Sequence, residues 1–200
     1  MNAIERLAEI FSRFPGIGPR QARRFVYFLL SRNGDYSGEL VRAVEELKKV
    51  ALQCQSCFRF FVPEGRKTPL CNTCADEARD PSTLMLVSRD VDCEAVEKSG
   101  GYRGYYFILG GVIPILEKEP EKRIRAKELD LRLKKDKKIK EVILATNANL
   151  DGENTADFIK ERYKNLNLEF SVLGRGLSTG AELEYADPET LKNALLHRTK

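Results

Sequence analysis

Four cysteines in two closely spaced pairs constrain this 200-residue chain more than any other feature. The pairs are Cys54 with Cys57 and Cys71 with Cys74; two residues lie within each pair and thirteen lie between the pairs. This spacing is typical of two knuckles that close one tetrahedral four-thiolate site for Zn²⁺. A closed site has no open position for water. The pattern therefore predicts one structural zinc ion per chain, stabilising a segment too short to form its own core.

Two disulfides or a redox-active pair are the alternatives for these cysteines. Glu5, Arg6 and Glu9 stand where an export signal would be apolar, and this argues against disulfides. The presence of two paired knuckles argues against a lone redox motif. The fifth cysteine, Cys93, falls on an expected helix, where we expect a small core side chain rather than a reactive thiol.

The composition is that of a globular chain, with 32% charged and 42% hydrophobic residues. Its longest apolar run, Phe25 to Leu30, is far shorter than the roughly 18 residues of a membrane helix. The single histidine, His197, excludes most catalysis by a histidine base. The net charge is only +4, but the stretch between Glu9 and Asp35 has no acidic residue. It holds five arginines: Arg13, Arg20, Arg23, Arg24 and Arg32.

This basic stretch coincides with a predicted hairpin between two helices. Apolar residues recur at helical spacing from Ile4 to Phe14, and a second helix is expected from Pro19 to Leu30. Glycines in the connection allow a tight turn and the close approach of a ligand, and the free N–H groups of the second helix favour an anion. We expect Ile17 to plug the hairpin into the helix pair. The predicted DNA-backbone contacts are Gly16, Ile17, Gly18, Arg20, Arg23 and Arg24; the alternative is an ordinary helix connection with a solvated basic face.

The remaining chain predicts an α+β protein of several parts. A third helix is expected after Gly34 ends the preceding segment, with Ser37 as its cap. Beyond Pro81, strands alternate with helices, which predicts a mostly parallel sheet covered on its faces. The expected strands are 84–87, 105–109, 142–145 and 168–173; the expected helices are 90–99, 119–135, 153–163 and one from about Pro188. The basic run Lys134 to Lys140 is interrupted or flanked by Asp130, Asp136 and Glu141, and we interpret it as a solvated helix end.

The order of these parts resembles the RecR family of bacterial recombination mediators. The resemblance covers nearly the whole chain and includes Gly101-Tyr102-Arg103-Gly104 and the tail Gly176 to Asp187. It implies a helix-hairpin-helix DNA-binding domain (1–53), a zinc-finger module (54–80), an α/β Toprim domain (81–173) and a Walker-B-like or oligomerisation tail (174–200). It also implies a ring-shaped homotetramer that clamps DNA in the cytoplasm, at the nucleoid. Such proteins act in DNA repair with RecO, and in many bacteria RecF, to help load RecA onto SSB-covered single-stranded or gapped DNA.

Catalytic Toprim domains hold Mg²⁺ with a glutamate after the first strand and Asp-x-Asp after a later one. Here Ser88 follows the first strand, where RecR-like chains usually carry glutamate, and Asn147 and Asn149 follow the later one. These residues predict a degenerate Toprim scaffold that is not an enzyme. The alternative is a metal-dependent nuclease or primase-like enzyme that uses the displaced acids Asp90, Asp151 and Glu153.

Two further sets of acidic residues have roles that the resemblance suggests. Asp151 and Glu153 are expected either to contact a partner, since the family's acidic Toprim surface is thought to meet RecO, or to favour the first turn of a helix. Glu182, Glu184 and Asp187 can touch a cation. The chain has no Gly-x4-Gly-Lys phosphate loop, so we expect a docking or oligomer-forming tail.

Overall fold

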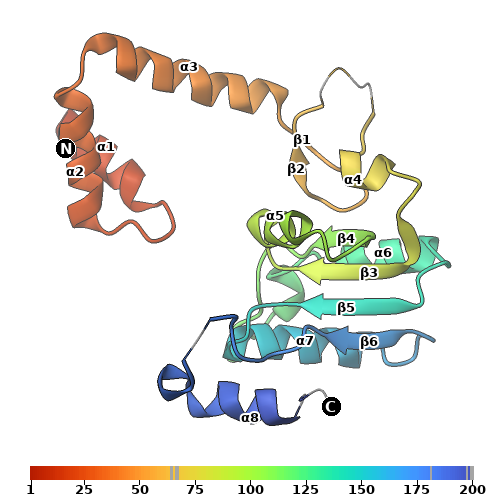
Figure 1. Cartoon of the computed structure of the whole chain (residues 1–200). Coiled ribbons are helices and arrows are strands. Elements are labelled where there is room, and N and C mark those ends of the chain that lie inside the picture. Colours follow the sequence, from red (N-terminus) through yellow and green to blue (C-terminus); the bar gives the residue numbers. More distant parts are fainter. Residues whose placement is uncertain (64, 66–67, 181, 197, 199–200) are drawn as a thin grey trace. The chain divides into compact units, whose positions relative to one another are not determined.

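The computed structural model describes residues 1–63, 65, 68–180, 182–196 and 198. The chain divides into two compact units, residues 1–51 and 52–200 (Figure 1). His197, the only histidine, lies outside the described residues. Among the helices of the described part, none is long and apolar enough to cross a membrane.

The first unit consists of α1 (Ala3–Ser12), α2 (Pro19–Leu30) and α3 (Gly34–Val50). A capping box starts α1: the Asn2 side chain accepts from the Glu5 N–H at 2.9 Å, and the Glu5 carboxylate accepts from the Asn2 N–H at 3.0 Å. Phe11 of α1 packs edge-to-face on Phe25 of α2, with ring centroids 5.8 Å apart. The first two helices are confirmed, and together they hold the hairpin (residues 14–18).

The start of α3 was predicted wrongly. The helix begins at Gly34, so Gly34 does not end a segment and Ser37 lies inside the first turn rather than at the cap. The Tyr36 N–H donates to the Asn33 carbonyl at 3.1 Å, and the Tyr36 ring packs on Phe28 at 5.7 Å. These contacts stabilise a turn that precedes Ser37. Of the residues in α3, none is buried.

The second unit is built on a four-stranded parallel sheet, as predicted. Its strands are β3 (Asp80–Val87), β4 (Gly104–Ile108), β5 (Glu141–Ala145) and β6 (Glu169–Val172), in the order β4-β3-β5-β6. Before the sheet, β1 (Leu52–Gln53) and β2 (Phe60–Phe61) pair antiparallel, and α4 (Asn72–Ala75) follows. Of these short elements, β1 leads directly into the cysteine module (residues 54–80), and β2 and α4 lie within it.

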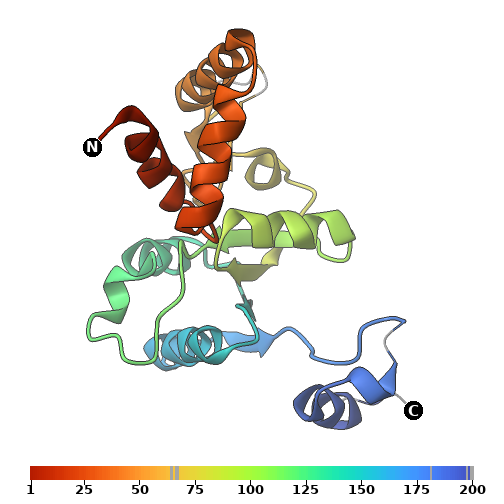
Figure 2. The same ribbon diagram turned by 90° about the vertical axis from the view of Figure 1, so that its left-hand side faces the viewer.

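Helices cover both faces of the sheet, so the core has two layers (Figure 2). On one face, α5 (Asp90–Ser99) buries Cys93 against Met85 and Tyr106, which confirms Cys93 as a core residue. On the other face lie α6 (Ala126–Lys135) and α7 (Leu150–Tyr163). Leu129 of α6 and Ile159 of α7 are fully buried there against the sheet.

Two helix boundaries differ from the prediction for local reasons. The expected helix 119–135 is a short 3₁₀ helix, η1 (Pro120–Lys122), followed by α6. The chain breaks between them because Ile124 is buried and the Arg125 N–H donates to the Leu109 carbonyl at 2.8 Å. Helix α7 begins three residues early because the Asn149 side chain accepts from the Gly152 N–H at 2.9 Å and caps it.

The tail carries a short 3₁₀ helix, η2 (Leu183–Tyr185), and α8 (Pro188–Leu196), which begins at the predicted residue. Asp187 caps α8, because its carboxylate accepts from the Thr190 N–H at 2.9 Å and from the Thr190 hydroxyl at 2.6 Å. The same hydroxyl bond is the largest cause that lowers the pKa of Asp187. Asp187 therefore stabilises the first turn of α8 within the tail.

Candidate metal centre and nucleic-acid interface

The four cysteines of the module come together in one cluster. Their sulfur atoms all lie within 4.8 Å of one another, and the Cys57 and Cys71 sulfurs are 3.6 Å apart. Cys54, Cys57 and Cys71 are buried, and Cys74 is partly buried. Four thiolates bound at 2.3 Å to one tetrahedral ion lie about 3.8 Å apart, so the cluster fits zinc. The arrangement closes all four positions and leaves none for a reacting water.

The backbone around the cysteines is folded into the two predicted knuckles. In the first knuckle, the Phe58 N–H donates to the Cys54 carbonyl at 2.9 Å, and Phe58 itself has a left-handed backbone with φ of 64°. In the second, the Cys71 N–H donates to the Cys54 sulfur at 3.4 Å. Hydrogen bonds from the neighbouring thiols of Cys57 and Cys71 lower the pKa of Cys54. Cys54 therefore favours thiolate, the form that binds metal.

The cysteine module is docked on the edge of the parallel sheet. The Ile108 N–H of β4 donates to the Cys57 carbonyl at 2.8 Å, and the Phe58 ring packs on Phe107 at 5.3 Å. From the α5 side, Asp90 accepts from the Phe60 N–H at 2.8 Å. These contacts join the metal-binding knuckle directly to an edge strand.

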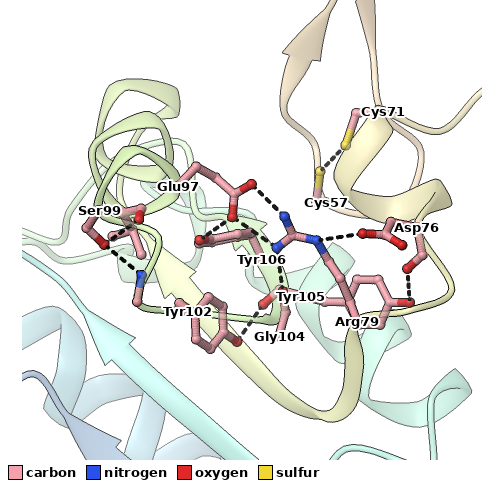
Figure 3. Close-up of polar contacts among 12 residues, drawn as sticks. Cys57, Cys71, Asp76, Arg79, Glu97, Ser99, Tyr102, Gly104, Tyr105 and Tyr106 are labelled. Atoms are coloured by element: carbon pink, nitrogen blue, oxygen red, sulfur yellow. Dashed lines mark hydrogen bonds and ion pairs between the residues drawn. The ribbon is translucent and has the colours of Figure 1, made fainter.

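A polar network reinforces this junction (Figure 3). The Arg79 guanidinium donates to both carboxylate oxygens of Glu97, at 2.9 and 2.6 Å, and to the Gly104 carbonyl at 3.0 Å. The Tyr106 hydroxyl donates to Glu97 at 2.7 Å. The sequence reasoning missed this network, because the partners are 18 and 9 residues apart and no local spacing relates them.

The hairpin presents unpaired amide groups at the start of α2. Gly16 has a positive φ of 77°, so the turn requires glycine there, whereas Gly18 has an ordinary φ of −81°. Apart from the glycines themselves and the residues directly flanking them, no atom of the described structure lies within 4 Å of where a Cβ would stand on either glycine. Among the described residues, no acceptor pairs with the N–H groups of Arg20 or Gln21, and the first turn holds no acid. The hairpin is thus open to an anion from outside.

The arginines around the hairpin differ in how they are engaged. Arg13 pairs with Glu9 at 2.6 Å, and Arg32 lies 4.5 Å from the centroid of the Phe28 ring. Arg20, Arg23 and Arg24 are exposed, and no carboxylate of the described residues lies within 4.0 Å of them. Among the described arginines of the acid-free stretch, these three contact neither a carboxylate nor the face of an aromatic ring, and Arg24 donates only to the neutral Gln21 side chain, at 3.4 Å. Ile17 is half-buried beside them.

The expected Toprim metal position lacks its acids. Ser88 is buried at the end of β3, and its hydroxyl has no partner among the described residues. Asn149 uses its side-chain oxygen to cap α7, and the Thr146 hydroxyl donates to the Gly152 carbonyl at 2.9 Å. A Cβ at Gly152 would overlap the Asn147 carbonyl, so the backbone closes tightly here. These neutral groups do not fit Mg²⁺, which proteins usually hold through one or two carboxylates.

The acidic residues Asp90, Asp151 and Glu153 do not supply the carboxylates that this position lacks. Asp90 is bonded to the Phe60 N–H, Glu153 pairs with Arg175 at 2.8 Å, and Asp151 lies in the first turn of α7. Within the described residues, the only group of three or more metal-ligating side chains is the cysteine cluster. The geometry therefore gives no support to a site of Asp90, Asp151 and Glu153.

Comparisons with known proteins match these parts in the same order. Residues 4–48 match the helix-hairpin-helix domain of RecR, residues 82–174 a Toprim domain, and residues 176–199 the C-terminal domain of RecR. The recombination protein RecR of Chloroflexus aggregans is 38% identical over 192 residues, covering 96% of this chain and 91% of the relative. The chain belongs to the RecR family. RecR of Bifidobacterium adolescentis is 38% identical over 197 residues, covering 98% and 95%, and that of a Roseiflexus species is 40% identical over 192 residues, covering 96% and 91%.

Each of these matched ranges corresponds to a part of the structure described above. The helix-hairpin-helix match spans the hairpin with its unpaired amides, and the Toprim match spans the parallel sheet. The four cysteines fall between these two matches, and their cluster is a metal-binding site within a RecR chain. Membership in this family supports a role in recombinational DNA repair.

Proposed function

We propose that this RecR chain is a non-catalytic clamp that holds the phosphate backbone of DNA during recombinational repair. The observation that carries the proposal is the hairpin, where unpaired amides of α2 adjoin three arginines without acidic partners. Amides and helix dipoles bind phosphate without reading bases. The proposed contacts are Gly16, Ile17, Gly18, Arg20, Arg23 and Arg24.

The division of labour follows the four parts of the chain. Residues 1–53 bind DNA, 54–80 hold one structural Zn²⁺, 81–173 form a Toprim scaffold and 174–200 form a docking or oligomerisation tail. The zinc assignment is supported by four converging sulfurs and by the absence of an open ligand position. The non-catalytic assignment is supported by Ser88, Asn147 and Asn149, which supply no carboxylate at the Toprim position.

The family supplies the partners of this proposal. We propose a ring-shaped homotetramer that acts at the nucleoid with RecO, and with RecF where that protein is present, to help load RecA onto single-stranded or gapped DNA covered by SSB. Exposed apolar side chains on α3 support self-association. Asp151 and Glu153, both partly exposed on the first turn of α7, are the proposed contacts for RecO.

The test is fluorescence anisotropy of labelled gapped DNA, titrated with salt in the presence of Mg²⁺. For the double variant Arg20→Ala/Arg24→Ala, we expect the slope of log affinity against log salt to flatten by about 1.4 to 1.8, because each lost phosphate contact removes roughly 0.7 to 0.9. The control is Lys160→Ala/Lys164→Ala, which removes the same charge from lysines paired with Asp157 and Glu161. An unchanged slope would contradict the hairpin assignment.

The same samples separate the clamp from the enzyme. The length of the labelled strand is checked on a denaturing gel after the titration. Intact DNA agrees with a clamp, whereas DNA cut or extended only with Mg²⁺ would overturn the non-catalytic proposal and direct attention to Asp90, Asp151 and Glu153. Failure of the wild-type chain to bind DNA at low salt would reject the DNA-binding proposal as a whole.

A further inference from the structure

Five exposed lysines gather where α6 ends and the chain turns into β5. This lysine patch consists of Lys134, Lys135, Lys137, Lys138 and Lys140. None of the five forms an ion pair within 4.0 Å with a carboxylate of the described residues, whereas Lys122, Lys160 and Lys164 elsewhere in the second unit do. The patch is therefore a concentration of cations that the fold itself leaves unpaired.

The acidic residues around the patch are engaged elsewhere. Asp136 accepts from Arg132 at 3.3 Å, and Asp130 accepts from Arg162 and from Tyr163, both at 2.7 Å. The Glu141 carboxylate accepts from the Ser171 hydroxyl at 2.5 Å.

Two lysines of the patch still have a carboxylate in electrostatic range, since Lys134 faces Asp130 and Lys140 faces Asp80. Asp80 also accepts from the N–H and the hydroxyl of Ser82, at 2.8 and 2.7 Å. The excess charge is therefore greatest at Lys135, Lys137 and Lys138.

The backbone displays these lysines from a fixed position. Leu133 and Ile139, on either side of the loop, are buried in the core beneath α6 and α7. The Lys140 N–H donates to the Ser82 carbonyl, and the Lys140 carbonyl accepts from the Glu169 N–H, each at 2.8 Å. The segment is thus tied to β3 and to the start of β6, at the amino-terminal edge of the parallel strands (Figure 1).

A solvated helix end accounts for only part of the patch. Helix α6 ends at Lys135, so its dipole favours the cations at Lys134 and Lys135. Lys137, Lys138 and Lys140 come after the helix and gain little from that dipole, because the effect is confined to the last turn. Three of the five lysines therefore need another explanation.

The chemistry of the patch fits a phosphate backbone better than a protein. Lysine is a compact, strongly hydrated charge on a flexible stem, which suits phosphates without demanding a fixed geometry. Protein interfaces are depleted in lysine and enriched in aromatic residues and arginine. In the run from 134 to 140 there is no aromatic residue and no arginine, and its only apolar side chain, Ile139, is buried.

We infer that the lysine patch is a second DNA-backbone contact surface, in the Toprim part of the chain and distinct from the hairpin. The inference rests on the proposed function, because it adds a surface to a DNA-binding protein. Binding through this surface is independent of base sequence and strongly sensitive to salt.

The experiment compares the full-length chain with the triple variant Lys135→Ala/Lys137→Ala/Lys138→Ala on one labelled duplex across a salt series. The slope of log affinity against log salt should flatten by about 2 to 3, at roughly 0.9 for each phosphate contact removed. The triple Lys→Arg variant at the same positions should keep the wild-type slope. The triple variant Lys122→Ala/Lys160→Ala/Lys164→Ala, which removes three paired lysines, should also keep it.

The outcomes separate this inference from the proposed function. If Arg20→Ala/Arg24→Ala flattens the slope and the lysine triple variant does not, the patch is not a DNA contact while the clamp proposal stands. If the wild-type chain does not bind the duplex at low salt, the clamp proposal itself fails. If the lysine triple variant loses only binding to a polyglutamate peptide, the patch is a protein-docking surface and the inference is wrong. Unchanged melting temperatures of the variants ensure that the slopes refer to folded protein.

Discussion

At the scale of single residues, the Glu97 carboxylate links the cysteine module to the sheet by accepting hydrogen bonds from Arg79 and Tyr106. Burial by itself raises the pKa of Glu97, but hydrogen bonds from Arg79 and Tyr106 outweigh it and hold the pKa of this carboxyl below its usual value. Burial also raises the pKa of Tyr106, so its hydroxyl stays protonated and donates. The Arg79 and Glu97 side chains are only 15% and 26% exposed, so water screens the pair weakly.

We expect Glu97→Gln to lower the free energy of unfolding by about 1 to 2 kcal/mol at pH 7, because it replaces charge-assisted hydrogen bonds with neutral ones. The folded-state pKa is lowered, so the stabilisation is complete above the unfolded pKa of about 4.3 and is lost as pH falls through the folded value. The difference between wild type and variant should therefore be constant from pH 6 to 8 and shrink below about pH 4. Urea unfolding at several pH values measures it.

The matched control for this residue is Glu94→Gln on the same helix. Glu94 is 62% exposed and its oxygen is 3.5 Å from Arg59, so its loss should change the free energy of unfolding by less than about 0.5 kcal/mol. Equal effects of the two variants at pH 7 would show that the Arg79–Glu97 pair is no stronger than a surface pair.

At the scale of elements, the features set by local sequence signals were predicted better than the features set by contacts between residues far apart in the chain. The limits of α2 and α5 and the parallel sheet follow from proline placement and apolar periodicity, and the metal cluster follows from cysteine spacing. The break before α6 was missed because it depends on the Arg125 N–H reaching Leu109, across 16 residues of chain. The cap of α3 was missed because Tyr36 packs on an aromatic ring of the preceding helix.

The edge strand β4 is coupled to the metal site, because its Ile108 N–H donates a hydrogen bond to the Cys57 carbonyl of a metal-binding knuckle. Removal of the metal should release the Cys57 carbonyl from the Ile108 N–H, since the knuckle lacks a core of its own. We expect strong chelation of the purified protein, whose zinc content is first measured by mass spectrometry, to speed amide exchange at Ile108 by at least about tenfold. Amides of β5, which pair with β3 and β6, serve as the control.

Two results would contradict this coupling. Protection of Ile108 that does not change after the metal has left would show that the junction with β4 holds the knuckle without the ion. Loss of protection at β5 to the same degree would show global unfolding rather than local release. Either result would separate the stability of the sheet from that of the cysteine module.

At the scale of the whole molecule, α3 carries an apolar stripe that the described residues leave largely exposed. Leu40, Val44 and Leu47 recur at helical spacing on one face, and Val44 and Leu47 are 53% and 57% exposed. A single chain gains nothing from this exposure, whereas a second copy can cover it. Repetition of the hairpin in an oligomer would also raise the affinity for DNA without new contacts within one chain.

We therefore expect Val44→Ser/Leu47→Ser to lower the oligomeric mass of the protein, because it removes apolar area that drives association. Light scattering coupled to size exclusion measures the mass, and anisotropy at fixed salt should show DNA binding weakened by about a hundredfold or more, because the avidity of several linked hairpins is lost. The control Glu45→Ser/Lys49→Ser alters the polar face of the same helix with no change in net charge. If both variants keep the wild-type mass, α3 does not join the copies, and the exposed apolar residues of the tail, Leu183 and Tyr185, become the next surface to test.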